Sequence, residues 1–249
     1  MPFDEALIVM GKVPRPGRVK TRLCPPLSPG DAATLYACML ADTASEMAAL
    51  RRVRRYLFLD PPEESGSLRV PPAEAFERLP QRGKNLGERM ANAAKIAFRD
   101  GARAVAIVGA DCPSLSAGKV RRTFRELRDG AGVVFGPSAD GGFYLAGMTS
   151  PDSRIFRGIP WSTPTVLADV ARRCRACGTP FAFLPPERDV DVFDDLVAFR
   201  EWARAHRSPA CPRTRDWVTA YFAVGGAGFP GRSCRTGGPP RDSRSRRGG

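Results

Sequence analysis

The chain has 249 residues, of which 43% are hydrophobic and 26% charged, an ordinary balance for a globular protein in water. No apolar run approaches the roughly 18 residues that span a membrane. Acidic residues stand near the start, where a secretory signal would be basic, so we expect a cytoplasmic protein. The net charge of +13 favours anionic ligands, but the basic residues are dispersed and give little support to nucleic-acid binding.

Short apolar runs alternate with helical patterns along the chain. Strands are predicted at 6–10, 56–59, 104–108, 132–135, 143–146 and 181–184. Helices are predicted from Ser28 to about Leu50, from Asn85 to about Phe98, from Ser116 to about Arg128, from Ser162 or Thr163 to about Cys174, from Asp194 to His206, and over Trp217–Phe222. The first two helices begin with the capping patterns Ser-Pro-Gly-Asp and Asn-Leu-Gly-Glu.

This alternation predicts an α/β fold with a mostly parallel sheet that is covered by helices on both faces. Ligands of such folds bind beyond the carboxyl ends of the strands. The segment 225–249 differs from the rest, because it holds six Arg against one Asp and almost no large apolar side chain. We therefore predict one folded domain over residues 1–224 and a disordered basic tail over 225–249.

The seven cysteines are an odd number and do not indicate a disulfide framework. Cys174 and Cys177 form a Cys-x-x-Cys pair, but a zinc site needs two more ligands. Only His206 and Cys211 follow at a plausible spacing. We expect ordinary reduced thiols.

The segment 11–23, which follows the first predicted strand, reads Gly-Lys-Val-Pro-Arg-Pro-Gly-Arg-Val-Lys-Thr-Arg-Leu and holds no acid. Its spacing excludes a phosphate-binding P-loop, in which Lys directly follows the second Gly. Pro14 and Pro16 also lack the N–H groups that such a loop uses. We expect binding of di- or triphosphate by the cationic side chains; a solvated basic loop is the alternative.

Acidic residues follow the later predicted strands. Asp111, in Gly-Ala-Asp-Cys-Pro, stands where its carboxylate faces either a divalent ion or the turn that it caps. Asp140 lies in Asp-Gly-Gly, which forms either a simple hairpin turn or the rim of a ligand site. Asp189 and Asp191 alternate along an extended stretch, so both can point into one site.

Together these motifs resemble those of a bacterial family of small glycosyltransferases with the GT-A, or nucleotide-diphospho-sugar transferase, fold, some of which are assigned to arsenosugar biosynthesis. The segments that carry the resemblance are Lys-x-Pro-x-Pro-Gly-x-Val-Lys-Thr-Arg-Leu, Leu-Gly-Glu-Arg-Met, Gly-Ala-Asp-Cys-Pro, Asp-Gly-Gly-Phe-Tyr-Leu and Asp-Val-Asp, spread over residues 7–199. The resemblance implies a single-domain, Rossmann-like three-layer sandwich. A more distant likeness is to nucleotidyltransferases of the same fold, such as 2-phospholactate guanylyltransferase.

The resemblance also implies roles for particular residues. Three cations would contact nucleotide phosphates: Lys12, Lys20 and Arg22. Three acids would hold or adjoin a divalent metal, Mg²⁺ or Mn²⁺: Asp111, Asp191 and, close by, Asp189. A sugar or acceptor pocket would include Asp140, Gly141 and Gly142, with Asp140 and Asp111 as catalytic residues. In one departure, the family commonly has Gly-Asp-Leu-Gly where this chain has Asn85, so a carboxylate is lost there.

We therefore expect a metal-dependent glycosyltransferase that moves a sugar from a nucleotide-diphosphate donor to a small-molecule acceptor. The alternative is a nucleotidyltransferase that uses a nucleoside triphosphate and releases pyrophosphate. A third possibility, a nucleic-acid-binding protein that uses the Arg-rich tail, lacks a recognisable binding motif or interleaved aromatic residues.

Overall fold

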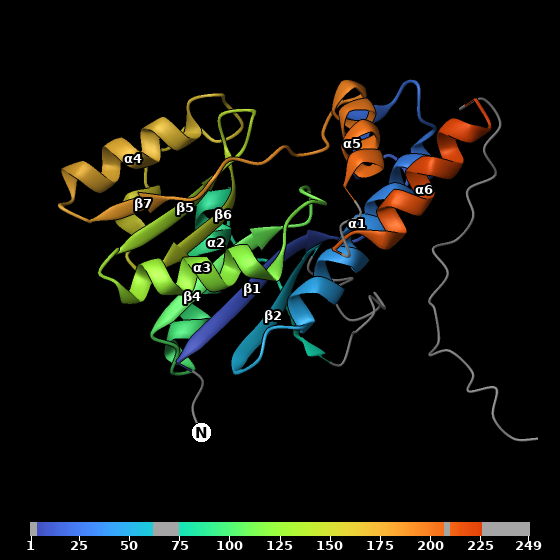
Figure 1. Ribbon diagram of the computed structural model, residues 1–249. Helices are drawn as coiled ribbons and strands as arrows, with labels where there is room; N and C mark the ends of the chain where they lie inside the picture. Colours follow the sequence, from blue (N-terminus) through green and yellow to red (C-terminus); the bar gives the residue numbers. More distant parts are fainter. Residues whose placement is uncertain (1–3, 62–74, 207–209, 226–249) are drawn as a thin grey trace, which may run out of the picture.

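The computed structural model describes residues 4–61, 75–206 and 210–225. The strands are β1 (Glu5–Lys12), β2 (Val53–Asp60), β3 (Glu77–Pro80), β4 (Ala104–Gly109), β5 (Val133–Pro137), β6 (Phe143–Met148) and β7 (Phe181–Phe183). They form one seven-stranded sheet in the order β3-β2-β1-β4-β6-β5-β7 (Figure 1). Neighbouring strands are parallel except at β6, which is antiparallel to β4 and β5. The predicted mostly parallel sheet is confirmed.

Helices cover both faces of this sheet. The α-helices are α1 (Pro29–Ala48), α2 (Leu86–Arg99), α3 (Ala117–Arg128), α4 (Val166–Ala176), α5 (Phe193–Ala205) and α6 (Pro212–Ala223), and η1 (Thr21–Leu23) and η4 (Ser153–Phe156) are short 3₁₀ helices. Side chains of α1 and α3 form a core on one face, and those of α2 and α4 form a core on the other. A third apolar cluster packs α5 and α6 against α1 (Figure 1). The three-layer α/β sandwich expected from the sequence is thus present.

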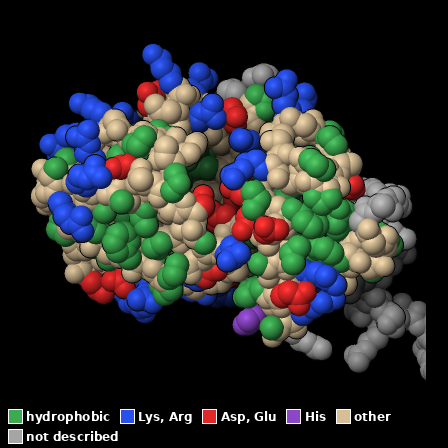
Figure 2. Space-filling model, turned by 90° about the horizontal axis from the view of Figure 1, so that it is seen from above, with side chains coloured by type: hydrophobic (Ala, Val, Ile, Leu, Met, Phe, Trp, Pro, Cys, Tyr) green, Lys and Arg blue, Asp and Glu red, His purple; other side chains and the backbone are tan. Residues whose placement is uncertain are grey.

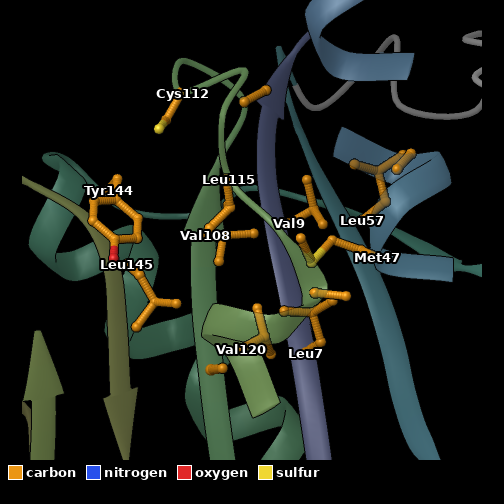
Figure 3. Packing of buried hydrophobic residues seen from close by; sticks show 14 of the residues in the cluster. Leu7, Val9, Met47, Leu57, Val108, Cys112, Leu115, Val120, Tyr144 and Leu145 are labelled. Atoms are coloured by element: carbon orange, nitrogen blue, oxygen red, sulfur yellow. The ribbon is translucent and has the colours of Figure 1, made fainter. Parts of the chain in front are cut away.

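Strand β1 shows why the runs of apolar residues in the strands are nearly continuous. Leu7 and Val9 point toward one core, where Figure 3 shows them on the same side as Met47 of α1 and Val120 of α3. Ile8, between them, belongs to the core on the opposite face. Because both faces of β1 are buried, strict alternation of polar and apolar residues is absent from it.

Both predicted capping patterns are present. Ser28 Oγ accepts a hydrogen bond from the backbone N–H of Asp31 at 3.1 Å, and Pro29 occupies the first turn of α1. Asn85 Oδ1 accepts from the N–H of Glu88 at 2.9 Å at the start of α2. These side chains satisfy N–H groups that have no partner within the helix, which fixes where each helix begins.

Three elements differ from the predictions. Strand β3 was not predicted, because Glu77–Pro80 is short, partly exposed and contains Arg and Pro. Helix α4 begins at Val166, later than predicted; Thr165 is its N-cap, and Ser162 adopts a left-handed conformation with φ of 68°. Helix α6 begins at Pro212, where proline suits the first turn.

Two other expectations concern the ends of the chain and membranes. Residues 226–249 of the predicted tail lie outside the described residues. Of the helices in the described ranges, none is both long and apolar enough to cross a membrane.

A buried carboxylate joins α1 to α6. Asp42, with a side chain 1% exposed, accepts hydrogen bonds from the N–H and the hydroxyl of Thr214, each at 2.8 Å. It also pairs with Arg213 at 3.2 Å. Asp42→Ala is expected to lower the free energy of unfolding by about 3 kcal/mol, because it leaves buried donors at the start of α6 without an acceptor. Urea unfolding measures this loss.

Asp216→Ala is the control, since that carboxylate lies on α6 itself, with its side chain 79% exposed. It is expected to leave the unfolding midpoint unchanged. Equal midpoints for Asp42→Ala and Asp216→Ala would contradict the role of Asp42 in holding α6.

Candidate functional site

A cavity of about 790 Å³ lies at the edge of the sheet where the parallel strands end. Its walls come from the segments that follow β1, β3, β4, β5, β6 and β7 and from the first turns of α2 (Leu86–Arg99). Figure 2 shows acidic and basic side chains gathered around a hollow on this face. The volume is in the range of pockets for small ligands. The predicted site residues that line the cavity are Lys12, Lys20, Arg22, Asp111, Asp140, Gly142, Asp189 and Asp191.

The basic loop after β1 is anchored by apolar residues that stand between its cations. Val19 and Leu23 are buried, with exposed fractions of 3% and 0%. The N–H of Lys12 donates a hydrogen bond to the buried hydroxyl of Tyr36 at 2.9 Å, which fixes the point where the loop leaves the strand. The side chains of Lys12 and Arg22 are exposed and line the cavity. The loop is therefore held to the protein while Lys12 and Arg22 face the cavity.

Lys20 differs from the other cations of this loop. Its side chain is only 4% exposed, and its ammonium lies 2.5 Å from Asp111 Oδ1 and 2.7 Å from Asp191 Oδ1. Burial disfavours the charged ammonium, but the two carboxylates outweigh this effect and raise the pKa of Lys20 above its ordinary value. The resemblance implied a phosphate contact for Lys20; in this structure its partners are the two acids.

The acidic segments are held together by their backbones. The N–H of Val190 donates to the carbonyl of Asp111 at 2.9 Å, which brings the segment after β7 beside the segment after β4. Burial opposes the charged form of Asp191, yet the cations Lys20, Arg22 and Lys12 outweigh it and hold the pKa of Asp191 below its ordinary value.

Asp189 lies in a different environment from its neighbours. Its Oδ1 atom is buried and has no hydrogen-bond partner within the described residues. Burial raises the pKa of Asp189 to about 7, and the nearby charges of Asp111, Asp140 and Asp191 add to this increase. The predicted convergence of Asp189 and Asp191 on one space is present, but only Asp191 is paired with a cation.

Asp140 organises the connection between β5 and β6. Its Oδ1 atom accepts hydrogen bonds from the hydroxyl of Ser138 and from the N–H of Gly142, the latter at 2.9 Å. Its other oxygen, Oδ2, has no hydrogen-bond partner in the described part of the chain. The segment is the hairpin connection that the sequence allowed, and Ser138, Asp140 and Gly142 of it also line the cavity.

Gly141 shapes this turn without lining the cavity. Its φ is +87°, and a Cβ added there would lie 1.9 Å from the carbonyl oxygen of Pro164. Gly141→Ala is therefore expected to lower the free energy of unfolding by more than about 2 kcal/mol and to displace Asp140. Thermal unfolding measures the first effect.

Gly178 provides the matched control. It also has a positive φ, +65°, but a Cβ there would meet nothing within 4 Å. Gly178→Ala is expected to cost about 1 kcal/mol, from backbone strain alone. Equal losses in the two variants would contradict the close contact between Gly141 and Pro164.

An apolar wall, which was not predicted, also lines the cavity. It is formed by Leu86, Met90, Phe143 and Trp161. The Trp161 ring packs edge-on against Phe143, with centroids 6.3 Å apart, and it lies so near Gly87 that a Cβ there would be 2.3 Å from the indole. Gly87, a glycine in the first turn of a predicted helix, was the one sequence signal of this close packing.

Two polar residues that line the cavity, Gln81 and Arg89, were also not predicted. Buried Gln81 donates hydrogen bonds to the carbonyls of Gly11 and Phe58, at 2.8 and 3.1 Å, and so joins the ends of β1 and β2. Arg89 pairs with Asp60 at 3.1 Å. Asn85, where the glycosyltransferases that the sequence resembles commonly have an acid, caps α2 and does not line the cavity.

The donor set suits a divalent cation of the kind that the resemblance implies. Among the described residues, no three His, Cys, Asp or Glu side chains form a group that could hold a metal ion by themselves. Asp111 and Asp191 nevertheless direct one oxygen each at a single ammonium. Mg²⁺ is usually bound by one or two carboxylates together with water and phosphate oxygens, and this pair matches that number of carboxylates.

The cysteines considered as zinc ligands lie in different parts of the fold. Cys174 is buried in α4 within the core beneath that helix, and Cys177 follows at its end. Cys211 precedes α6 and belongs to the cluster that packs α6 against α1. All three are free thiols.

Comparisons with known proteins identify the fold. The sequence profile of a family described as "Uncharacterized protein conserved in bacteria (DUF2064)" matches residues 43–163. No curated protein matches the sequence. The crystal structure of a candidate nucleotide-diphospho-sugar transferase from Desulfovibrio desulfuricans G20 is similar, with a TM-score of 0.78 and 28% identity over 88% of this chain and 96% of that chain. The chain therefore has the nucleotide-diphospho-sugar transferase fold.

Two nucleotidyltransferases share this fold at low sequence identity. A cytidylyltransferase from Leptospira borgpetersenii has a TM-score of 0.55 and 9% identity, over 90% of this chain and 95% of that chain. CMP:2-keto-3-deoxy-manno-octonic acid synthetase in complex with CTP has a TM-score of 0.51 and 12% identity, over 81% of this chain and 99% of that chain. At these identities the likeness concerns the fold alone.

Proposed function

We propose that this protein is a metal-dependent glycosyltransferase that moves a sugar from a nucleotide-diphosphate donor to a small-molecule acceptor. The observation that carries the proposal is the meeting of a cationic loop and a pair of carboxylates in one cavity, at the carboxyl edge of the sheet. Cations suit a diphosphate, and paired carboxylates suit the divalent ion that accompanies it. The similarity to the Desulfovibrio protein supports the donor class.

On the donor side, Lys12 and Arg22 would bind the diphosphate, since both side chains are exposed to the cavity. Asp111 and Asp191 would hold Mg²⁺ or Mn²⁺, which offsets negative charge on the departing diphosphate when it is bound. Fixed positive side chains stabilise the same charge without having to reorganise.

On the acceptor side, Asp140 would orient the attacking hydroxyl and take its proton on Oδ2, the oxygen not engaged in the turn. A bond then forms between the acceptor oxygen and the sugar carbon that loses its bond to the phosphate oxygen, and the electron pair leaves with the diphosphate. Gly141 and Gly142 would keep Asp140 in place. The apolar wall at Trp161 would exclude water from this part of the cavity.

The test is a panel of UDP-, GDP-, ADP- and dTDP-hexoses with Mn²⁺, in which binding is followed by thermal shift and turnover by release of the nucleoside diphosphate. One donor is expected to stabilise the protein with metal and to be slowly hydrolysed when water replaces the acceptor. If no donor binds or turns over, the proposal is wrong.

The second candidate function is nucleotidyl transfer. The number of cationic side chains in the cavity favours it. The cavity is lined by Lys12, Lys20 and Arg22, a set that can serve three phosphates as well as two. The same panel with nucleoside triphosphates and a sugar phosphate separates the two reactions. Release of pyrophosphate favours this candidate, whereas consumption of a nucleotide sugar without pyrophosphate favours glycosyl transfer.

A further inference from the structure

The Lys20 ammonium stands at the point where the two proposed metal-binding carboxylates converge. Asp111 Oδ1 and Asp191 Oδ1 lie 2.5 and 2.7 Å from Lys20 Nζ, and the lysine side chain is 4% exposed. The acids are far less enclosed, with side chains 50% and 36% exposed. The carboxylate oxygens that would suit a divalent ion are therefore already paired with the ammonium of a buried lysine.

The backbone of Lys20 adds a second, independent observation. Its φ and ψ are 48° and 36°, the left-handed conformation that side-chain-bearing residues rarely adopt. Such a conformation persists where the surrounding structure determines it. Here buried Val19 precedes Lys20, and the 3₁₀ helix Thr21–Leu23 with buried Leu23 follows it. The loop thus fixes the lysine at this position.

We propose that Lys20 is an internal counter-ion that occupies the divalent-cation position until phosphate groups enter the cavity, so that metal and nucleotide bind together. This inference rests on the proposed function, since it concerns the same cavity. Lys20 itself lines that cavity beside Arg22, so its ammonium has phosphate oxygens as new partners when a nucleotide is bound. Asp111 and Asp191 are then released to the metal.

The charges explain why the exchange needs the nucleotide. Without ligand, the lysine offsets one of the two carboxylate charges, and Lys12 and Arg22 act on Asp191 as well. A metal ion that arrives alone must displace a buried ammonium and leave it without a partner, which is unfavourable. Phosphates remove that cost because they accept the displaced ammonium.

The proposal is tested with Lys20→Met by titration with Mn²⁺ alone, followed by electron paramagnetic resonance. The variant is expected to bind Mn²⁺ roughly tenfold more tightly than the wild type or better, because no ammonium has to be displaced. Arg18→Met is the matched control, since it removes the same charge from the same loop at an exposed position that does not line the cavity. It is expected to change the affinity by less than about threefold, the effect of a screened, exposed charge. Equal affinity in Lys20→Met and the wild type overturns the proposal.

A double variant tests whether any gain in Mn²⁺ affinity of Lys20→Met depends on the carboxylate of Asp191. Lys20→Met combined with Asp191→Asn is expected to lose the gain in Mn²⁺ affinity, and a gain that survives in this double variant overturns the proposal. If Lys20→Met does not fold without metal, Mn²⁺ is expected to restore its thermal transition, and failure to restore it also overturns the proposal. These titrations contain no nucleotide sugar, so the result on Lys20 is independent of whether sugar is transferred.

Discussion

Asp111→Asn is expected to abolish Mn²⁺-dependent binding of a nucleoside diphosphate and to lower turnover of the nucleotide sugar by roughly a thousandfold or more. The substitution keeps the shape of the side chain but removes its charge. Asp111 supplies one of the two oxygens that converge on Lys20. With only Asp191 left, Lys20 neutralises the remaining carboxylate and the metal loses its site. Isothermal titration calorimetry with and without Mn²⁺ measures the loss.

Asp129→Asn is the matched control for this experiment. Asp129 is exposed, follows the end of α3 and does not line the cavity. It is expected to bind Mn²⁺ and nucleotide as the wild type does. If Asp111→Asn keeps its metal-dependent affinity while both proteins are folded, Asp111 is not a metal ligand.

Arg22→Ala is expected to weaken binding of a nucleoside diphosphate by roughly ten- to a hundredfold, which is the size of a charge-assisted hydrogen bond to phosphate. Arg22 faces the cavity and contributes to the field that lowers the pKa of Asp191. The loss is expected to shrink as salt is added, because the contact is partly exposed. Fluorescence titration at two salt concentrations measures both effects.

Arg18→Ala separates a specific contact from the general charge of the loop. Arg18 belongs to the same loop and carries the same charge, but it is exposed and does not line the cavity. Its replacement is expected to change the affinity less than twofold at physiological salt. An equal loss in both variants would show that the loop acts only through its net charge.

The sequence was sufficient to predict the long elements of the fold. The segments that became β1 and β4 are apolar over most of their length because both faces are buried, and α1 and α2 begin at recognisable caps. Strand β3 could not be predicted, because its four residues have no apolar run and it joins the sheet only through pairing with β2. Local pattern carries no information on such pairing.

Some features of the candidate site could likewise be predicted from the sequence, and others could not. The acids and cations stand at ends of strands, so their meeting at one edge follows from a parallel sheet. The partners of Lys20 could not be read from the sequence, because Asp111 and Asp191 are far from it along the chain, Asp191 by 171 residues, and the contacts depend on the exact paths of the loops. Trp161 was missed for a similar reason, since its place beside Gly87 depends on the connection between β6 and α4.

We expect phosphate to bind between the cationic loop and a metal held by Asp111 and Asp191. Crystals grown with Mn²⁺ and the nucleoside diphosphate that binds most tightly test it directly. We expect an anomalous manganese peak between these two carboxylates, phosphate oxygens on Lys12 and Arg22, and the Lys20 ammonium turned toward the phosphate. A nucleotide bound elsewhere, or manganese without a contact to Asp111, would contradict it.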